Sequence, residues 1–299
     1  MADIALRFHK DMLVLSSPLE PVLIRQGYDL SDGMEYLHAV EPEALRGAMR
    51  LNEVAGAQCM VVELDDLTPF RLAQSRKEGQ VDEVVAAAFD VLGDSRPQHV
   101  FVEIGPCGLP LDSSSKNSVE ENCDQYARAA KTLSRRSFDA FFLNGFSKPA
   151  DIACAIDGLH RESDAPVIVS VGVDKQGRLD DGRRSIDDAL AAMNEHGAAV
   201  AGFSISAPIE WASALTRRAC RQTSMPVLVQ LDVRACDPKQ GEATEENPYF
   251  CPDTMVEAAT VLRSAGAQFL RAVGAATPAY TSTLVATTED LDVVRKVEG

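Results

Sequence analysis

The sequence has few features that would bind a nucleic acid or enter a membrane. It carries 29 lysines and arginines against 45 aspartates and glutamates, a formal net charge of −16, and it contains no run of basic residues. A chain of this charge repels polyanions. It also has no apolar stretch near the ~20 residues that span a bilayer, and no basic segment followed by a long apolar one at its amino terminus. We therefore expect a cytoplasmic protein with no nucleic-acid or membrane partner.

The sequence also gives little support for disulfide bonds, for an aromatic cage or for a site built on histidine. The seven cysteines are scattered, their number is odd, and no two form a Cys-x-x-Cys pair, so free thiols are the expected state. The single tryptophan, Trp211, falls on a predicted helix, which weakens the case for an aromatic cage around a cation. None of the five histidines falls at the carboxyl end of a predicted strand, which argues against a Ser-His-Asp triad or a histidine-bound metal.

The chain does have a regular alternation of short apolar runs and longer segments of helical period, the pattern of βα units around a parallel sheet. Eight strands are predicted, at 12–16, 59–64, 100–105, 140–145, 167–173, 200–205, 227–233 and 268–274. Helices are predicted between them, at 43–55, 80–92, 119–135, 149–161, 185–196, 209–222 and 253–265. Ser118 and Glu121 have the spacing of a capping box, and Gly56, Gly197 and Gly266 follow three helices as expected left-handed caps.

Eight such units in fewer than 300 residues predict an α/β fold, a single (β/α)8 TIM barrel over residues 1–299. No linker rich in proline, glycine or serine divides the chain. The alternative is an open doubly wound sheet. That fold normally has a glycine-rich turn after its first strand, whereas residues 16–21 read Ser-Ser-Pro-Leu-Glu-Pro. The barrel is therefore preferred.

In a TIM barrel, the ligand-binding groups follow the carboxyl ends of the strands. The candidate ligand-binding residues at those places are Glu63, Asp65, Glu103, Asn144, Asp232, Arg234 and Arg271. Alternation along strand 227–233 and the residue after it puts Gln230, Asp232 and Arg234 on the face opposite the valines, and hence inside the barrel. Buried charges need partners, so Glu103, Asp232, Arg234 and Arg271 are candidates for one ionic network. Such a network either only neutralises itself or grips a charged ligand, and both alternatives stay open.

Five short segments stand in a characteristic order along nearly the whole chain. Residues 104–108 read Ile-Gly-Pro-Cys-Gly, residues 202–205 read Gly-Phe-Ser-Ile, and residues 266–278 read Gly-Ala-Gln-Phe-Leu-Arg-Ala-Val-Gly-Ala-Ala-Thr-Pro. They resemble the I-G-P-x-G, G-x-N-C and G-A-x-x-x-G-G-C-C-G-T-T-P motifs of the homocysteine S-methyltransferase family. Residues 169–178 are similar to its V-S-F-x-x-D-x-x-G-R segment, and residues 234–238 to its N-A-G-x-P segment.

This resemblance implies a (β/α)8 barrel like the homocysteine-binding module of cobalamin-dependent methionine synthase and the betaine-homocysteine methyltransferases. In that family three cysteines hold a zinc ion, which binds the homocysteine thiol and lowers its pKa for attack on the donor methyl group. The matching positions here are Ile205, Val273 and Gly274, and none of these side chains ligates zinc. We therefore expect no metal at these positions and no cofactor.

Other chemical motifs of the family have changed as well, while the scaffold motifs are kept. The family's D-G-A-M-G-T, T-N-T-F and E-T segments correspond to residues 17–21, 63–66 and 144–145, where the sequence differs. A zinc site that has moved to Cys107, Cys236 and Cys251 is the alternative, but Cys107 lies several strands away around the predicted barrel. We therefore expect a divergent member of the family.

Three hypotheses about function follow. The first is a homocysteine S-methyltransferase-like protein without the zinc-thiolate mechanism, which binds a small amino-acid-like or methyl-donor ligand at the acidic C-terminal face of the barrel. The second is a non-catalytic subunit or module that docks on a corrinoid- or folate-binding methyltransferase partner. The third is an unrelated barrel enzyme that uses a carboxylate, such as Glu103 or Asp232, as its acid or base.

Overall fold

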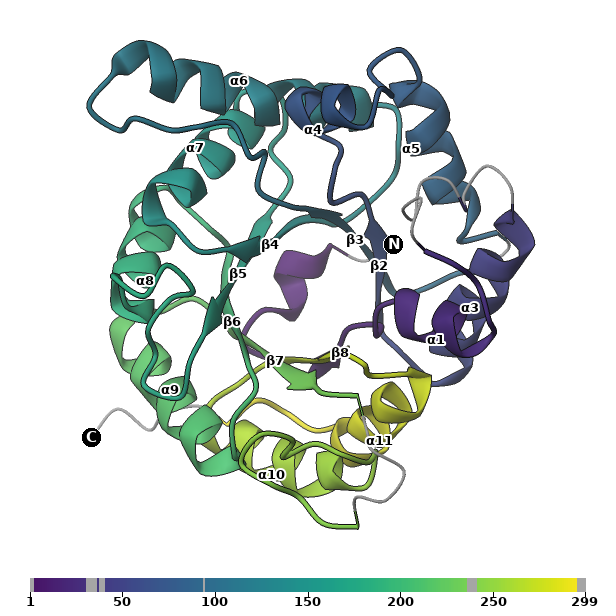
Figure 1. The fold of residues 1–299 in the computed structure, drawn as a ribbon. Helices are drawn as coiled ribbons and strands as arrows, with labels where there is room; N and C mark the ends of the chain where they lie inside the picture. The colour runs from purple at the N-terminus through teal and green to yellow at the C-terminus, as the bar shows by residue number, and fades with distance from the viewer. Residues whose placement is uncertain (1–2, 31–36, 38–40, 94, 236–240, 295–299) are drawn as a thin grey trace.

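The computed structural model describes residues 3–30, 37, 41–93, 95–235 and 241–294. Its eight strands are parallel and pair in the order β1-β8-β7-β6-β5-β4-β3-β2. They are β1 (Leu13–Val14), β2 (Cys59–Glu63), β3 (His99–Ile104), β4 (Ala140–Phe146), β5 (Val167–Val173), β6 (Val200–Ile205), β7 (Val227–Val233) and β8 (Phe269–Gly274). Figure 1 looks along the axis of this sheet, with the helices arranged around it.

The α-helices surround the strands on the outside, whereas the short helix η1 lies across the amino-terminal end of the barrel. The helices are η1 (Ile4–Arg7), α1 (Glu20–Arg25), α3 (Pro42–Val54), α4 (Pro69–Gln74), α5 (Val81–Asp90), α6 (Lys116–Leu133), α7 (Pro149–His160), α8 (Ile186–Glu195), α9 (Ile209–Gln222), α10 (Thr254–Ala265) and α11 (Pro278–Thr288). Within the described residues, no helix combines the length and the apolar character needed to cross a membrane.

The sheet closes on itself between its first two strands. Leu15, just beyond β1, forms a parallel bridge with Cys59 of β2. The amide of Ser16 donates to the Cys59 carbonyl over 2.9 Å, and the amide of Gln58 donates to the Val14 carbonyl over 3.1 Å. The predicted TIM barrel is thus confirmed, and the open doubly wound sheet is wrong.

The helix ends agree in part with the expected signals. Gly56, Gly197 and Gly266 have φ angles of 85°, 81° and 106°, the left-handed conformation expected of C-terminal caps. The capping box predicted at Ser118 is wrong, because α6 begins two residues earlier and its N-cap is Ser115, whose side chain accepts from the Ser118 amide. The glycines thus predicted the carboxyl ends of three helices correctly. Serine was a weaker signal for the start of α6, because Ser118 also fits inside a helical turn.

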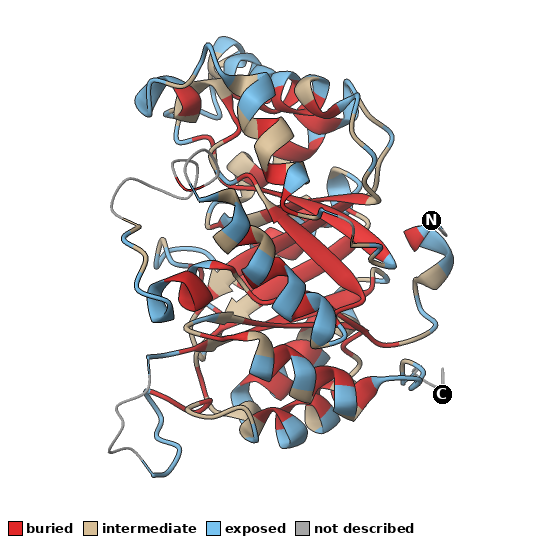
Figure 2. Ribbon diagram, turned by 90° about the vertical axis from the view of Figure 1, so that its right-hand side faces the viewer, coloured by how far each residue is buried: buried red, intermediate tan, exposed pale blue. Residues whose placement is uncertain are grey.

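Three apolar clusters determine where a site can lie, the smallest of them around α1, α3 and β2. The largest fills the space between barrel and helices, and the third fills the barrel interior, where Phe101, Phe142 and Phe269 are buried. Ile4 of η1 closes the interior core from the amino-terminal side. Figure 2 shows the buried strands between helices that are exposed outside. Each fully buried side chain of this kind stabilises the fold by about 1.5–3 kcal/mol, so polar groups are left to the carboxyl end of the barrel.

Candidate functional site

A buried ion pair lies across the barrel interior. Arg271 of β8 donates from Nη1 to Oε2 of Glu103 on β3 over 3.0 Å, and both residues are at most 5% exposed. The Nε of Arg271 donates to the Ser16 carbonyl over 2.9 Å, and the guanidinium lies 5.4 Å from the ring centre of Phe142. The expected contact between Glu103 and Arg271 is therefore made, on top of the apolar interior core.

Amide side chains extend this ion pair into a network. Asn144 donates to Oε1 of Glu103 over 2.5 Å, and Gln230 donates to Asn144 over 2.8 Å and to Ser170 over 2.7 Å. Asn144 points inward at an irregularity of β4, where the register shifts and Gly145 has a φ of 77°. Bulges commonly re-aim side chains next to sites. The inward orientation predicted for Gln230 is confirmed, although neither Gln230 nor Ser170 is among the candidate ligand-binding residues.

Two further carboxylates stand above the ion pair. Glu63 accepts a hydrogen bond from the Leu19 amide over 3.1 Å. Burial, together with repulsion by Glu103, raises the pKa of Glu63 to about 7, with Arg271 opposing the shift. The protein wall and the charges of Glu103 and Glu63 also raise the pKa of Asp65, although this side chain keeps contact with solvent. Of the three carboxyl groups only Glu103 contacts the Arg271 guanidinium, and Asp65 is exposed, so Glu63 is the group most disposed to hold a proton.

Asp232 and Arg234 are not part of this network, which corrects the expectation of a single ionic cluster. On β7 it is Gln230 that pairs in register with Arg271, whereas Asp232 pairs with Val273, two residues further along the strand. Both charged residues therefore lie one layer above the buried pair. Strand alternation identified the correct face, but it does not give the depth.

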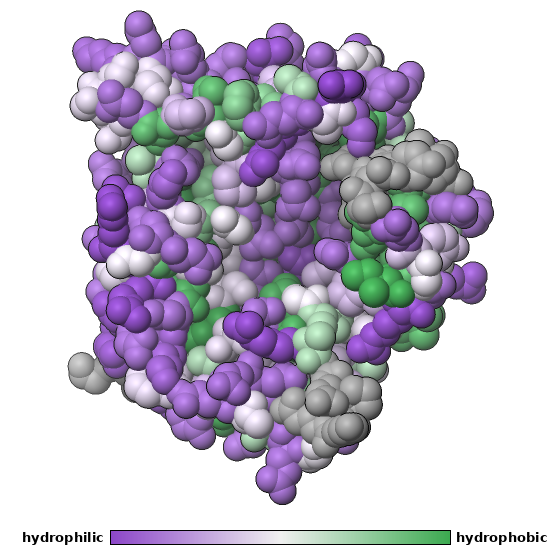
Figure 3. Space-filling model, viewed as in Figure 1, coloured by the Kyte–Doolittle hydropathy of each residue, from purple (hydrophilic) through white to green (hydrophobic). Residues whose placement is uncertain are grey.

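Asp232 and Arg234 instead line a pocket of about 680 Å³ beyond the ends of β5, β6 and β7, which we call the mouth pocket. Arg234 donates from Nε to the Ser206 hydroxyl over 3.2 Å. Burial raises the pKa of Asp232, and Arg234 opposes this shift. Lys175 and Glu245, from two different loops, form an ion pair at the rim. Figure 3 shows a hydrophilic hollow at the centre of this face of the molecule.

The positions at which the resemblance placed zinc ligands carry no ligating atoms. Ile205 is 1% exposed and packs in the core between the barrel and the helices, and Val273 and Gly274 end β8. Gly274 has a φ of 67°, and a Cβ there would overlap the carboxylate of Asp232 and lie 2.5 Å from the Val233 carbonyl oxygen. A cysteine at position 274 would therefore require the backbone of β7 or β8 to shift.

The alternative cysteine set is only partly described. Cys107 is buried, and its thiol lies 3.4 Å from Oδ1 of Asn122 on α6. Cys251 is partly buried just before α10, and Cys236 lies outside the described residues. Across the part of the chain that the structure describes, no three His, Cys, Asp or Glu side chains are grouped so as to hold a metal ion.

Comparison with known proteins places this geometry in a family. A family model described as homocysteine S-methyltransferase matches residues 23–280. No curated protein sequence matches the chain. The homocysteine methyltransferase MmuM from Escherichia coli is similar in structure, with a TM-score of 0.73 in its metallated form and 0.74 in its oxidized form. Each form is 18% identical over 93% of this chain and 96% of that one.

A more distant likeness shows how widely the fold itself is shared. Pyruvate carboxylase from Rhizobium etli matches 94% of this chain with 26% of its own, at 11% identity and a TM-score of 0.53. Structural likeness at these identities shows the fold alone. The family model is stronger evidence for family membership, because it matches the sequence from α1 to the start of α11. The chain belongs to the homocysteine S-methyltransferase family.

Proposed function

We propose that this chain is a divergent homocysteine S-methyltransferase-like protein that works without the zinc-thiolate mechanism. In this proposal it binds a small amino-acid-like or methyl-donor ligand at the carboxyl face of the barrel. The observation that carries the proposal is the mouth pocket, in which Asp232 and Arg234 present opposite charges.

The lining of the mouth pocket suits a zwitterion with an apolar or thioether side chain. Arg234 is a donor for a carboxylate, because its guanidinium is planar and permanently charged. Asp232 attracts an ammonium group, and its burial beside the pocket strengthens that attraction relative to bulk water. Pro208, which is partly exposed, supplies apolar surface at the edge of the pocket. The volume of about 680 Å³ is within the usual range for small-molecule sites.

A thiol that accepts a methyl group in this pocket would have to lose its proton. Without a metal to lower the pKa of the thiol, a side chain would need to accept that proton. Glu63, with a pKa of about 7, is matched to give or accept a proton near neutral pH. Any zinc chemistry would require ligands other than Ile205, Val273 and Gly274. The proposal therefore assigns ligand binding to the mouth pocket beyond β5, β6 and β7, and it names Glu63, at the end of β2, as the candidate proton acceptor.

Calorimetry with homocysteine, methionine, betaine and simple amines tests the binding. We expect saturable binding of at least one of them, weakened about tenfold or more by Asp232→Asn and by Arg234→Met, since each removes one charge-assisted contact. Asp124→Asn and Arg128→Met remove the same charges from an exposed ion pair on α6 and serve as controls. No detectable binding of any of these ligands would contradict the proposal. So would control variants that weaken binding as much as Asp232→Asn and Arg234→Met.

Metal analysis tests the second half of the proposal. Protein purified after expression with added zinc should contain well below one equivalent of the metal. A stoichiometric amount of zinc that is lost in Cys236→Ser would show a relocated site and overturn this part. Docking on a corrinoid- or folate-binding partner protein stays a prediction, for which co-purification with such a protein is the test.

A further inference from the structure

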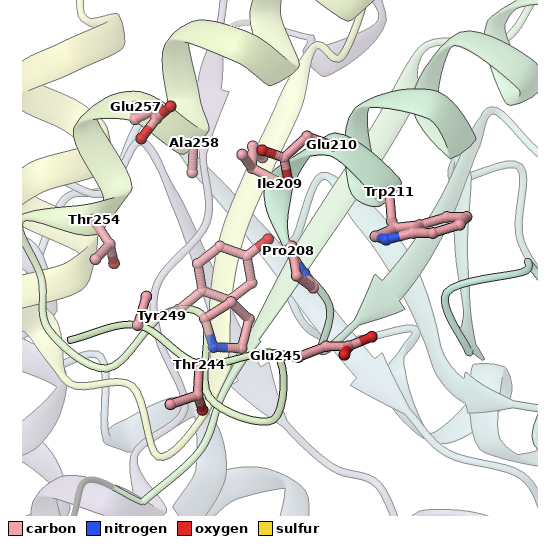
Figure 4. A pocket seen from close by; sticks show the side chains of 12 residues that line it. Pro208, Ile209, Glu210, Trp211, Thr244, Glu245, Tyr249, Thr254, Glu257 and Ala258 are labelled. Atoms are coloured by element: carbon pink, nitrogen blue, oxygen red, sulfur yellow. The ribbon is translucent and has the colours of Figure 1, made fainter. Parts of the chain in front are cut away.

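A second cavity lies outside the barrel, between the starts of α9 and α10 and the segment 243–249, with a volume of about 460 Å³. Figure 4 shows the labelled side chains of these three segments arranged around Tyr249, with those of Trp211 and Glu245 directed away from its ring. The mechanism proposed above does not use it. Its volume is within the range of small-molecule sites, and its lining combines aromatic, apolar and acidic groups.

The floor of this cavity is held in place by hydrogen bonds. Tyr249 is buried, with its ring at the centre of Figure 4. Its hydroxyl donates to the Ala207 carbonyl over 2.7 Å, and its own carbonyl accepts from the Tyr280 hydroxyl over 3.3 Å. The hydroxyl and the backbone of Tyr249 are thus both held before any ligand arrives, which lowers the entropic cost of binding.

The walls are acidic and aromatic. Glu210, Glu245 and Glu257 all line the cavity, and none of its lining residues is basic. Glu245 pairs with Lys175, whereas Glu210 and Glu257 form no ion pair with a described residue. Trp211, 44% exposed, completes the wall beside Glu210. Two carboxylates without a cation, beside two aromatic side chains, make a place that attracts positive charge on an apolar body.

We propose that this cavity binds a small organic cation, a primary ammonium carried on an apolar skeleton. The ammonium group would lie between Glu210 and Glu257, and its skeleton would pack on Tyr249 and the prolines of the lining. The net charge of −16 also raises the local concentration of cations around the molecule.

The cavity adjoins the mouth pocket, so a ligand bound in the cavity would affect the residues that the two spaces share. Pro208 and Glu245 line both spaces. The hydroxyl of Tyr249 holds the carbonyl of Ala207, which also lines the mouth pocket. An ammonium group between Glu210 and Glu257 adds a positive charge near this rim, where Lys175 pairs with Glu245.

Trp211 is the only tryptophan of the chain, so its fluorescence reports binding at this cavity directly. The probe is cyclohexylammonium at neutral pH, with cyclohexanol as the uncharged analogue and sodium chloride holding the ionic strength constant. We expect a saturable change with the cation and none with the alcohol. Asp232→Asn, in the mouth pocket, should leave this response unchanged, which separates the cavity from the site proposed above.

Charge variants complete the test. Glu210→Gln and Glu257→Gln should each weaken binding about threefold and together about tenfold, the range of exposed ion pairs. Glu121→Gln, an exposed carboxylate on α6, is the matched control. Circular dichroism verifies that all variants fold. An equal response to cyclohexanol, no saturable response to the cation, or a double variant that binds like the control would overturn the proposal.

Discussion

Arg271 and Glu103 join opposite parts of the barrel, with Nη1 of one 3.0 Å from Oε2 of the other. The same guanidinium holds the carbonyl of Ser16 after β1 and approaches Oε1 of Gln230 on β7 at 3.4 Å. One side chain therefore connects β1, β3, β7 and β8 around the interior. A buried ion pair adds little net stability over an apolar pair of the same volume, but a partner left alone is costly.

Replacing Arg271 alone should therefore destabilise the protein strongly. Arg271→Met leaves Glu103 buried without its counter-charge, and we expect a loss of about 3–5 kcal/mol in the free energy of unfolding. The double variant Arg271→Met with Glu103→Leu should recover most of this loss. Urea unfolding of the wild type, Arg271→Met, Glu103→Leu and the double variant measures the cycle. A cost below about 1 kcal/mol for the single variant would mean that water solvates the site.

Glu63 should make stability fall as the pH rises toward neutrality. Its pKa in the folded chain, about 7, lies above the ordinary value of 4.5. Between these two values the folded chain binds more protons than the unfolded chain, so the contribution is present below pH 4.5 and lost above about 7. Glu63→Gln removes the ionisation and should raise stability at pH 8 by about 1–3 kcal/mol, with little change at pH 4.5.

Urea unfolding across pH 4.5 to 8 verifies this dependence. Glu53→Gln, an exposed carboxylate on α3, is the control and should follow the wild-type curve at every pH. A Glu63→Gln variant whose curve runs parallel to the wild type would show that Glu63 titrates in the ordinary range.

The fold was predictable because its strands are buried on both faces. The predicted bounds of β5, β6 and β7 coincide with those observed, since continuous apolar runs are typical of parallel strands. The helices α1, α4 and α11 were not predicted. The first two have six residues each, too few for a periodic pattern, and α11 buries Thr281 and Thr288, which obscures an apolar stripe. All three have proline in the first turn, a signal that could have marked them.

The candidate site was predictable in its residue types but not in its layers. Glu103, Asn144 and Arg271 meet because they point inward at matching depth, and Glu63 stands beside them. Asp232 and Arg234 belong to the mouth pocket instead. A periodicity of two gives the face of a strand, whereas the depth depends on the register between strands, which is set by long-range pairing.

Asn52 of α3 should be essential for the loop after β1. Its Oδ1 accepts from the amide and the hydroxyl of Ser17, each over 2.9 Å, and its Nδ2 donates to the Ser17 carbonyl over 3.0 Å. Asn52→Ala leaves a buried backbone amide and carbonyl unpaired and should cost about 2–4 kcal/mol. Ser17→Ala removes only the hydroxyl contact and should cost about 1 kcal/mol. Equal costs in thermal or urea unfolding would contradict this account of Asn52.

The same substitution at two helical glycines should have opposite effects. Gly158 lies where α7 crosses α6, and a Cβ there would overlap the Cys123 carbonyl oxygen and lie 2.9 Å from Cβ of Tyr126. Gly47 lies within α3 and has no atom within 4 Å of such a Cβ. Gly158→Ala must push the two helices apart and should destabilise the protein by about 1–3 kcal/mol. Gly47→Ala should stabilise it by about 0.4–1 kcal/mol, because alanine restricts the unfolded chain. Urea unfolding decides, and a shift of the same sign for both variants would show that α6 and α7 are less tightly packed than the geometry requires.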